Sequence, residues 1–213
     1  MVLTVRSVKR TLDSQIVTTS TEAATGGARV DAILRAACRV VVEDGAHDLR
    51  MATVARQAGV SKALVHYYFT TRQELLRAAF VFAEEERERT LEAELEALVS
   101  GAARVERALL HAIDPDVDES PGLWNEVWSS LRSDPELRPL VQQHYRGWAE
   151  RIVRLLMEGK VDGSVSATVD PAEAGWRLAA IADGLESILY LGLFDLERAR
   201  TLLVSALRME LEE

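Results

Sequence analysis

The stretch from Gly59 to Phe69 reads GVSKALVHYYF and gathers side chains that can bind an anionic polymer. Lys62 supplies a cation, and His66 and Tyr67 supply hydrogen-bonding groups on flat rings. On a helix placed in a DNA major groove, the N-terminal residues reach base edges while tyrosine and histidine side chains contact phosphates. The chemistry available to this stretch is therefore recognition of nucleic acid, provided that the surrounding elements expose it.

The residues around this stretch predict two short helices joined by a tight turn, the layout of a helix-turn-helix. An apolar set recurs at helical spacing over residues 51–58 and ends at Gly59, which adopts positive φ without steric cost. Ser61 then stands at an N-cap position. The buried side of the second helix is predicted to be Val60, Leu64, Val65 and Phe69. The outward side is then Lys62, Ala63, His66 and Tyr67.

An alternative is that the aromatic cluster belongs to a core or an interface, as most aromatic residues do. Taken alone, His66, Tyr67 and Tyr68 fit that interpretation equally well. The context favours exposure, because Lys62, His66 and Tyr67 are hard to bury together on a helix whose opposite side is already apolar.

The net charge of −9 is distributed unevenly along the chain. Residues 1–80 hold 11 Lys and Arg against 7 Asp and Glu, whereas residues 81–213 hold 14 against 27. This asymmetry indicates a small basic part followed by a larger acidic one. We expect an anionic polymer to bind the basic part.

Several other classes of protein are disfavoured by the sequence. No run approaches the ~20 apolar residues of a membrane span, and residues 1–24 lack the pattern of a signal peptide, so we expect a cytoplasmic protein without a membrane partner. The single cysteine, Cys38, excludes an intrachain disulfide. Histidine spacing gives no metal site, and no catalytic motif appears, so no enzyme activity, metal or cofactor is predicted. The run DPDVDE at 114–119 lacks the glycine and glutamate of a calcium loop and is interpreted as a solvated loop.

Helical periodicity continues along the chain without any long alternating strand pattern, so the predicted fold is all-α with about nine helices. A three-helix helix-turn-helix domain is joined by a long fourth helix, beginning near Arg72, to a C-terminal helical domain. Further helices are predicted at about 101–113, 121–133, 135–158, 171–192 and 195–211, and the first at about 27–44. The predicted domains are a flexible arm (1–26), a DNA-binding domain (27–72) and a ligand-binding and dimerisation domain (73–213). The arm is interpreted as an inert tail, with a DNA-contacting role as the alternative.

Residues 29–80, RVDAILRAACRVVVEDGAHDLRMATVARQAGVSKALVHYYFTTRQELLRAAF, closely resemble the N-terminal domain of tetracycline-repressor (TetR) family transcriptional regulators. The resemblance runs through the VARQAGVS, HYYF and TTRQELL segments. It implies an all-helical homodimer that presents one helix-turn-helix per subunit to successive major grooves of a palindromic operator. It also implies a ligand domain that makes a repressor releasable by a small molecule.

The resemblance assigns roles to individual residues. The DNA-contacting set is predicted to be Arg50, Ser61, Lys62, Ala63, Leu64, His66, Tyr67 and Arg72. Lys62 and Ala63 stand where the family makes base contacts, and His66, Tyr67 and Arg72 stand where it holds phosphates.

Three members of this set depart from the family pattern. Arg50 replaces the Ser or Thr that usually caps the first helix of the motif, so the cap passes to another group, with Asp48 as the candidate. Leu64 replaces a frequent Thr and His66 a frequent Tyr. The operator sequence is left open by these departures.

The C-terminal part resembles, more weakly, the ligand domain of choline-responsive betaine-pathway repressors, through LWNEVWSSLRSDPELRPLVQQHYRGWAERI (123–152) and WRLAAIADGLESILYLGLFD (176–195). A ligand pocket is predicted among Trp124, Trp128, Leu131, Tyr145, Trp148 and Trp176. Their rings suit an apolar pocket or a cage for a cationic ligand. Ordinary core packing is the alternative for each residue taken singly.

The last two helices carry more apolar residues than one core face needs, which predicts a two-fold dimer. Gly184 permits the close approach of a partner helix, and the family packs these helices as a four-helix bundle. The predicted interface is Leu178, Ile181, Gly184, Leu185, Ile188, Leu203 and Leu207.

The preferred hypothesis is a homodimeric DNA-binding transcriptional regulator, a repressor released by an unidentified small-molecule effector. An alternative is an all-α small-molecule-binding protein or enzyme with a vestigial helix-turn-helix. A purely structural helical adaptor is a third class, which leaves the basic face of GVSKALVHYYF unexplained.

Overall fold

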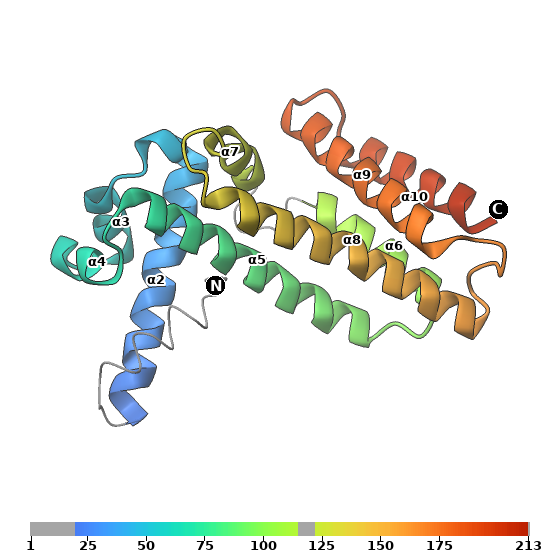
Figure 1. Ribbon diagram of the computed structural model, residues 1–213, viewed down its shortest axis with the longest axis horizontal. Helices are drawn as coiled ribbons and strands as arrows, with labels where there is room; N and C mark the ends of the chain where they lie inside the picture. The colour runs from blue at the N-terminus through green and yellow to red at the C-terminus, as the bar shows by residue number, and fades with distance from the viewer. Residues whose placement is uncertain (1–19, 115–121, 213) are drawn as a thin grey trace. The chain divides into compact units, whose positions relative to one another are not determined.

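A computed structural model describes residues 20–114 and 122–212 of the chain (Figure 1). Over these ranges the structure has nine α-helices, one short 3-10 helix and no strand. The predicted all-α fold, with its helix-turn-helix and long connecting helix, is confirmed. In the same ranges, no helix is both long enough and apolar enough to cross a membrane.

The elements follow one another with short connections. In chain order they are α2 (Ser20–Asp44), η1 (Ala46–Asp48), α3 (Met51–Ala58), α4 (Lys62–Tyr68), α5 (Arg72–Glu96), α6 (Gly101–Ile113), α7 (Leu123–Ser130), α8 (Leu137–Asp162), α9 (Pro171–Tyr190) and α10 (Leu196–Glu212). The first helix begins at Ser20, earlier than predicted, because the small residues of STEAATGGA have no apolar period to reveal a helix. Most of the predicted arm, and residues 115–119 of the predicted acidic loop, lie outside the described residues.

The chain divides into two compact units. We call Met1–Glu86 with Ser120–Leu140 the head unit, and Arg87–Glu119 with Val141–Glu213 the body unit. Helices α5 and α8 each run from one unit into the other. The head unit therefore contains not only α2, α3 and α4 but also α7, which the sequence grouped with the ligand domain.

The core of the head unit forms where α2 packs against α3 and α7, and where α3 packs against α4. The stripe predicted on α2 is buried: Ile33, Leu34, Ala37, Val40 and Val41. The other largest fully buried side chains of the head unit are Leu49, Phe69, Leu75, Phe80 and Leu137. This packing fixes α4 by its apolar back and leaves its other side to solvent.

Polar contacts tie the segment 122–140 into the head unit. The indole N–H of Trp124 donates to Glu84 Oε1 at 2.9 Å, and the ring meets Phe80 edge-on at 4.9 Å between centroids. Arg77 Nη1 donates to both carboxylate oxygens of the buried Asp134, at 2.7 and 2.9 Å. Charge-assisted bonds of this kind are strong when shielded from water.

The body unit is built around α6, α9 and α10, which pack against one another. Its core also takes apolar residues from the second half of α5 and from α8, including Leu91, Ile152 and Leu156. At Gly101 the start of α6 approaches α8 so closely that an added Cβ would lie 2.2 Å from the backbone nitrogen of Gly159. Only glycine fits this contact.

Candidate functional site

The turn before α4 has the geometry that the sequence predicts. Gly59 adopts the left-handed conformation, with φ 68° and ψ 29°, and ends α3. Ser61 caps α4, because its Oγ accepts a hydrogen bond from the backbone N–H of Leu64 at 3.1 Å. Local sequence signals thus fix both the end of one helix and the start of the next.

The two sides of α4 differ as predicted. Val65 and Phe69 are buried, at 0% and 1% exposure, whereas Val60 and Leu64 are half-buried. The outward residues are all exposed: Lys62, Ala63, His66 and Tyr67. Tyr67 is 60% exposed and meets Tyr68 edge-on at 5.1 Å between ring centroids. His66 and Tyr67 therefore do not join the core of the head unit, and only Tyr68 is half-buried.

Arg50 precedes α3 in the capping position but makes no side-chain cap. Its side chain is 76% exposed and pairs with Asp48 at 3.4 Å. Asp48, the candidate substitute, therefore faces Arg50 and does not cap the helix. Both side chains lie in solvent, where such a pair contributes ~0–1 kcal/mol and leaves the guanidinium available to another anion.

Arg72 has an internal role that the sequence did not reveal. Its Nη1 donates to the carbonyl oxygens of Ala46 at 3.0 Å and His47 at 2.5 Å, so the start of α5 holds the η1 turn. From the other side, Glu126 Oε2 of α7 accepts a hydrogen bond from the backbone N–H of Ala46 at 2.8 Å. The turn that leads into α3 is therefore held by two side chains from distant parts of the sequence.

The six predicted pocket residues fall into both units. Trp124, Trp128 and Leu131 belong to the head unit. Trp124 is 9% exposed and acts there as a core residue bonded to Glu84, which fits the ordinary core interpretation. Trp128 is 46% exposed, with its ring 6.1 Å from that of Trp124.

The other three pocket residues belong to the body unit. Tyr145 and Trp176 place their ring centroids 6.2 Å apart, and Trp148 packs against the core of this unit. Burial raises the pKa of the Tyr145 hydroxyl, and the negative charge of Asp183 adds to the rise. Asp183 is itself half-buried, and burial raises the pKa of its carboxyl group. A carboxylate therefore lies near an aromatic pair in this unit.

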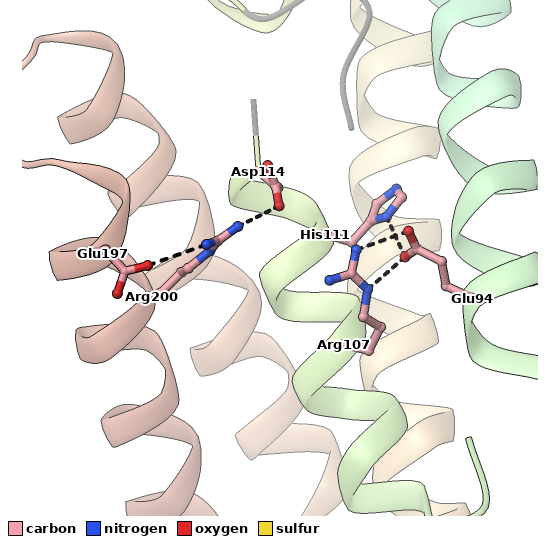
Figure 2. A network of polar contacts seen from close by, with 6 residues as sticks. All are labelled: Glu94, Arg107, His111, Asp114, Glu197 and Arg200. Carbon is pink, nitrogen blue, oxygen red and sulfur yellow. Dashed lines mark hydrogen bonds and ion pairs between the residues drawn. The ribbon is translucent and has the colours of Figure 1, made fainter. Parts of the chain in front are cut away.

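A second polar cluster in the body unit was missed by sequence reasoning. Glu94 of α5 binds both Arg107 and His111 of α6 (Figure 2). The i, i+4 spacing of Arg107 and His111 puts them on one helix face, but their partner lies in another helix, which no local pattern identifies. A neighbouring network joins Arg200 to Asp114 at 2.8 Å and to Glu197 at 3.5 Å.

The seven predicted interface residues divide between core and surface. Four of them lie in the core of the subunit itself: Leu178, Leu185, Leu203 and Leu207. Ile181 is 37% exposed, Gly184 is exposed, and Ile188 is half-buried. Helix periodicity identifies an apolar face but does not tell which partner covers it. The predicted interface therefore included residues of the body-unit core together with surface residues.

Two segments of the chain match known families. Residues 33–79 match the bacterial regulatory proteins of the tetR family, and residues 101–212 match the C-terminal domain of BetI-type transcriptional repressors. The chain belongs to the TetR family. The resemblance found in residues 29–80 and the weaker one in the C-terminal part are both confirmed.

Individual TetR-family relatives agree with this assignment. HTH-type transcriptional regulator BetI of Escherichia coli O17:K52:H18 (strain UMN026 / ExPEC) is 30% identical over 162 residues, which cover 73% of this chain and 77% of that protein. A crystal structure from Rhodococcus sp., described as a TetR-family transcriptional regulator, has a TM-score of 0.75 and 30% identity, covering 86% of this chain and 98% of the other. A transcriptional regulator from Saccharomonospora viridis, crystallised in complex with choline, has a TM-score of 0.75 and 25% identity, covering 83% and 93%.

Membership of the TetR family decides between the classes that the sequence left open. The chain is a DNA-binding transcriptional regulator, and its relatives are regulators rather than enzymes. The exposed face of α4 is the part of the described structure whose residues suit contact with DNA.

Proposed function

We propose that this TetR-family regulator binds a palindromic operator as a homodimer, with α4 of each subunit in a major groove, and represses until a small molecule releases it. The observation that carries the proposal is the two-sided character of α4, with an apolar back in the core and a basic, aromatic front in solvent. This front lies outside the core of the head unit, and a DNA duplex supplies the phosphates and base edges that suit its side chains.

The residues of α4 and its flanks are proposed to differ in the part of the DNA that they contact. Lys62 and Ala63, in the first turn, are proposed to contact base edges, and His66 and Tyr67 to contact phosphates. Leu64 and Ser61 are proposed to contribute shape and helix position, because Leu64 is half-buried and the Ser61 hydroxyl is used as a cap.

The two arginines flanking this motif are proposed to act in different ways. The exposed Arg50 is proposed to reach a phosphate directly. Arg72 is proposed to act mainly by holding the η1 turn, since its Nη1 already donates to two carbonyl groups.

The surface of α9 and α10 is proposed to form the dimer contact. Apolar side chains on these two helices are exposed although their opposite sides fill the core: Ile181 (37%), Leu202 (38%) and Met209 (70%). A Cβ placed at Gly184 would meet nothing within 4 Å, so this face is open to a second helix. Operator half-sites lie one turn of DNA apart, about 34–36 Å, and a two-fold dimer would bring one copy of α4 for each half-site.

A small organic cation such as choline is proposed as the effector. The regulator from Saccharomonospora viridis supports this choice, because it was crystallised with choline. In the present chain, the ring pair Tyr145–Trp176 and the half-buried carboxylate of Asp183 provide groups that attract a cation. No cation among the described residues is paired with Asp183, and a half-buried carboxylate gains most from such a partner.

Selection from random-sequence DNA duplexes tests the proposal. The purified full chain is expected to enrich sites with two-fold symmetry, and bound duplex is expected to dissociate when choline is added. Enrichment of asymmetric single half-sites would contradict the dimeric mode of binding, and failure to enrich any sequence would contradict specific operator recognition.

A further inference from the structure

We propose that Nε2 of His111 accepts a hydrogen bond from the effector, so that the effector presents a hydroxyl or N–H donor to this point of the body unit. The inference rests on the proposed function, since it concerns the small molecule that releases the operator. It adds the chemical class of group that the protein recognises and the residue that recognises it.

Glu94 contacts both Arg107 and His111. Arg107 holds this carboxylate in a two-pronged contact, with Nε 2.8 Å from Oε2 and Nη2 3.0 Å from Oε1. His111 Nδ1 lies 2.9 Å from the same Oε2 (Figure 2). The orientation of the imidazole is thus fixed by a carboxylate that is itself held by a guanidinium, the arrangement that sets the tautomer of a histidine.

The pKa values of Glu94 and His111 are both lowered, which decides where the proton of this pair lies. Burial opposes ionisation of Glu94, but the hydrogen bonds from Arg107 and His111 outweigh it, and the pKa of the Glu94 carboxyl is lowered. Burial lowers the pKa of His111, against the raising effect of Glu94. The stable combination near neutral pH is therefore a carboxylate beside a neutral imidazole. A neutral imidazole facing a carboxylate through Nδ1 carries its single proton there, so Nε2 is left as an acceptor.

Nε2 of His111 is buried. His111 is 3% exposed, and no described residue forms a hydrogen bond with Nε2. A buried acceptor without a donor destabilises a fold, so a leucine at this position would pack at lower cost. The rest of the inward face of α6 follows that rule: Val105, Ala108, Leu109 and Ile113. An oriented imidazole whose buried Nε2 has no donor calls for an explanation, and a ligand that donates a hydrogen bond to Nε2 supplies one.

The chemical class of the ligand follows from the tautomer. A hydroxyl or an N–H can donate to Nε2, whereas a carboxylate, a carbonyl or an ether oxygen would bring one acceptor against another. Sites that bury a polar group reject analogues that cannot pair with it, because the group is then desolvated without compensation. The body unit is therefore expected to discriminate between an alcohol and its methyl ether.

Matched pairs of compounds test this inference on the full-length protein. The pairs are choline and its O-methyl ether, 1-octanol and methyl octyl ether, and an N-alkylacetamide and its N-methylated analogue. Each compound is assayed by thermal shift and by release of the selected operator. For at least one pair, the hydrogen-bond donor is expected to shift the thermal midpoint and release the operator at a concentration roughly tenfold lower than its methylated analogue. This ratio corresponds to the free energy of one good hydrogen bond.

Two variants assign the discrimination to His111. In His111→Phe the ratio between donor and capped compound is expected to fall to about one, since the ring is kept and the acceptor is lost. Glu94→Gln is expected to reduce the ratio partway, because an amide no longer fixes which ring nitrogen carries the proton. Long-range 1H–15N spectra of the wild type are expected to show the Nδ1–H tautomer, with an Nε2 shift that moves when the donor compound binds.

Several results would overturn the inference. These are a panel in which no donor outperforms its capped partner on the wild type, a His111→Phe protein with undiminished discrimination, and a wild-type spectrum of the Nε2–H tautomer. If His111→Phe does not fold, Glu94→Gln and the wild-type spectrum still decide. Operator binding measured without any compound tests the proposed function separately, since it does not depend on His111 chemistry.

Discussion

At the scale of the residue, side chains one to three positions apart on α4 have opposite tasks. Val65 is fully buried and holds the helix to the head unit, whereas Lys62 and His66 lie in solvent. These positions could be predicted from the sequence because helical periodicity alone decides which side of a short helix is apolar. The bonds of Arg72 could not, because their acceptors are backbone carbonyls of residues 46 and 47, far along the chain.

Substitutions at Arg72 separate its internal role from a phosphate contact. Arg72→Lys keeps the positive charge but cannot donate to two carbonyls from one planar group. If the internal role dominates, this variant weakens operator binding about as much as Arg72→Ala, and both keep the salt dependence of the wild type. If Arg72 instead neutralises a phosphate, Arg72→Ala lowers the slope of log K against log salt by about one while Arg72→Lys keeps it. Titration of the operator at several salt concentrations distinguishes these results.

His111 is expected to make stability depend on pH in a defined window. Its pKa is lowered from the ordinary 6.5 by burial, with Arg87 and Arg107 also lowering it and Glu94 opposing them. Below 6.5 the unfolded chain binds a proton that the folded chain does not, so stability falls as the pH decreases through this window. The thermal midpoint of the wild type is expected to drop between pH 7.5 and 5.5. His111→Phe should lose part of that drop, and equal slopes for the two proteins would contradict the assignment.

At the scale of the element, the helix order, the cap of α4 and most helix boundaries could be predicted because their causes are local. Ser61 caps α4, and Gly59 and Gly45 follow the helices that they end. The start of α2 at Ser20 could not be predicted, because its first residues are small and lack an apolar stripe. The inclusion of α7 in the head unit could not be predicted either, since it depends on contacts of Trp124 and Glu126 with residues distant in the sequence.

The crossing of α6 and α8 depends on the absence of one methyl group. Gly101→Ala places a Cβ 2.2 Å from Gly159 N and 2.8 Å from the Leu155 carbonyl oxygen, and backbone atoms cannot turn aside as a side chain can. We expect a loss of about 1–3 kcal/mol in the free energy of unfolding, measured by urea denaturation. Gly147→Ala in α8 is the control, because its Cβ would meet nothing within 4 Å and helix propensity favours alanine by about 0.4–1 kcal/mol. Equal effects of the two substitutions would refute the close approach.

At the scale of the whole molecule, the sequence indicated that α9 and α10 are too apolar for one core face. The sequence could not show which residue of these helices is in the core and which is on the surface, because one apolar stripe contributes to both. Leu178 and Leu203 are core residues, whereas Ile181 is exposed and Gly184 lies on the same open face. The pocket prediction grouped the tryptophans by residue type. The sequence does not show that they belong to two different units.

Ile181→Asp tests the proposed dimer. A carboxylate on this face would have to be desolvated in the interface, so we expect the dimer to dissociate at micromolar concentration. Sedimentation equilibrium measures the change. Val161→Asp is the matched control, since Val161 is 89% exposed and belongs to α8 rather than to α9 or α10. A dimer that persists in Ile181→Asp, or dissociates equally in Val161→Asp, argues against this surface.

The outward face of α4 is proposed to recognise the operator. Titration of the selected operator with the variants Lys62→Ala and Tyr67→Ala tests this role most directly. Both residues are exposed, so neither substitution should lower the thermal midpoint by more than a degree or so. Lys62→Ala is expected to weaken binding by roughly 1–3 kcal/mol and to relax the preference at one base pair per half-site. Tyr67→Ala is expected to weaken binding to all sequences alike. Folded variants that bind the operator with wild-type affinity and preference would contradict the account.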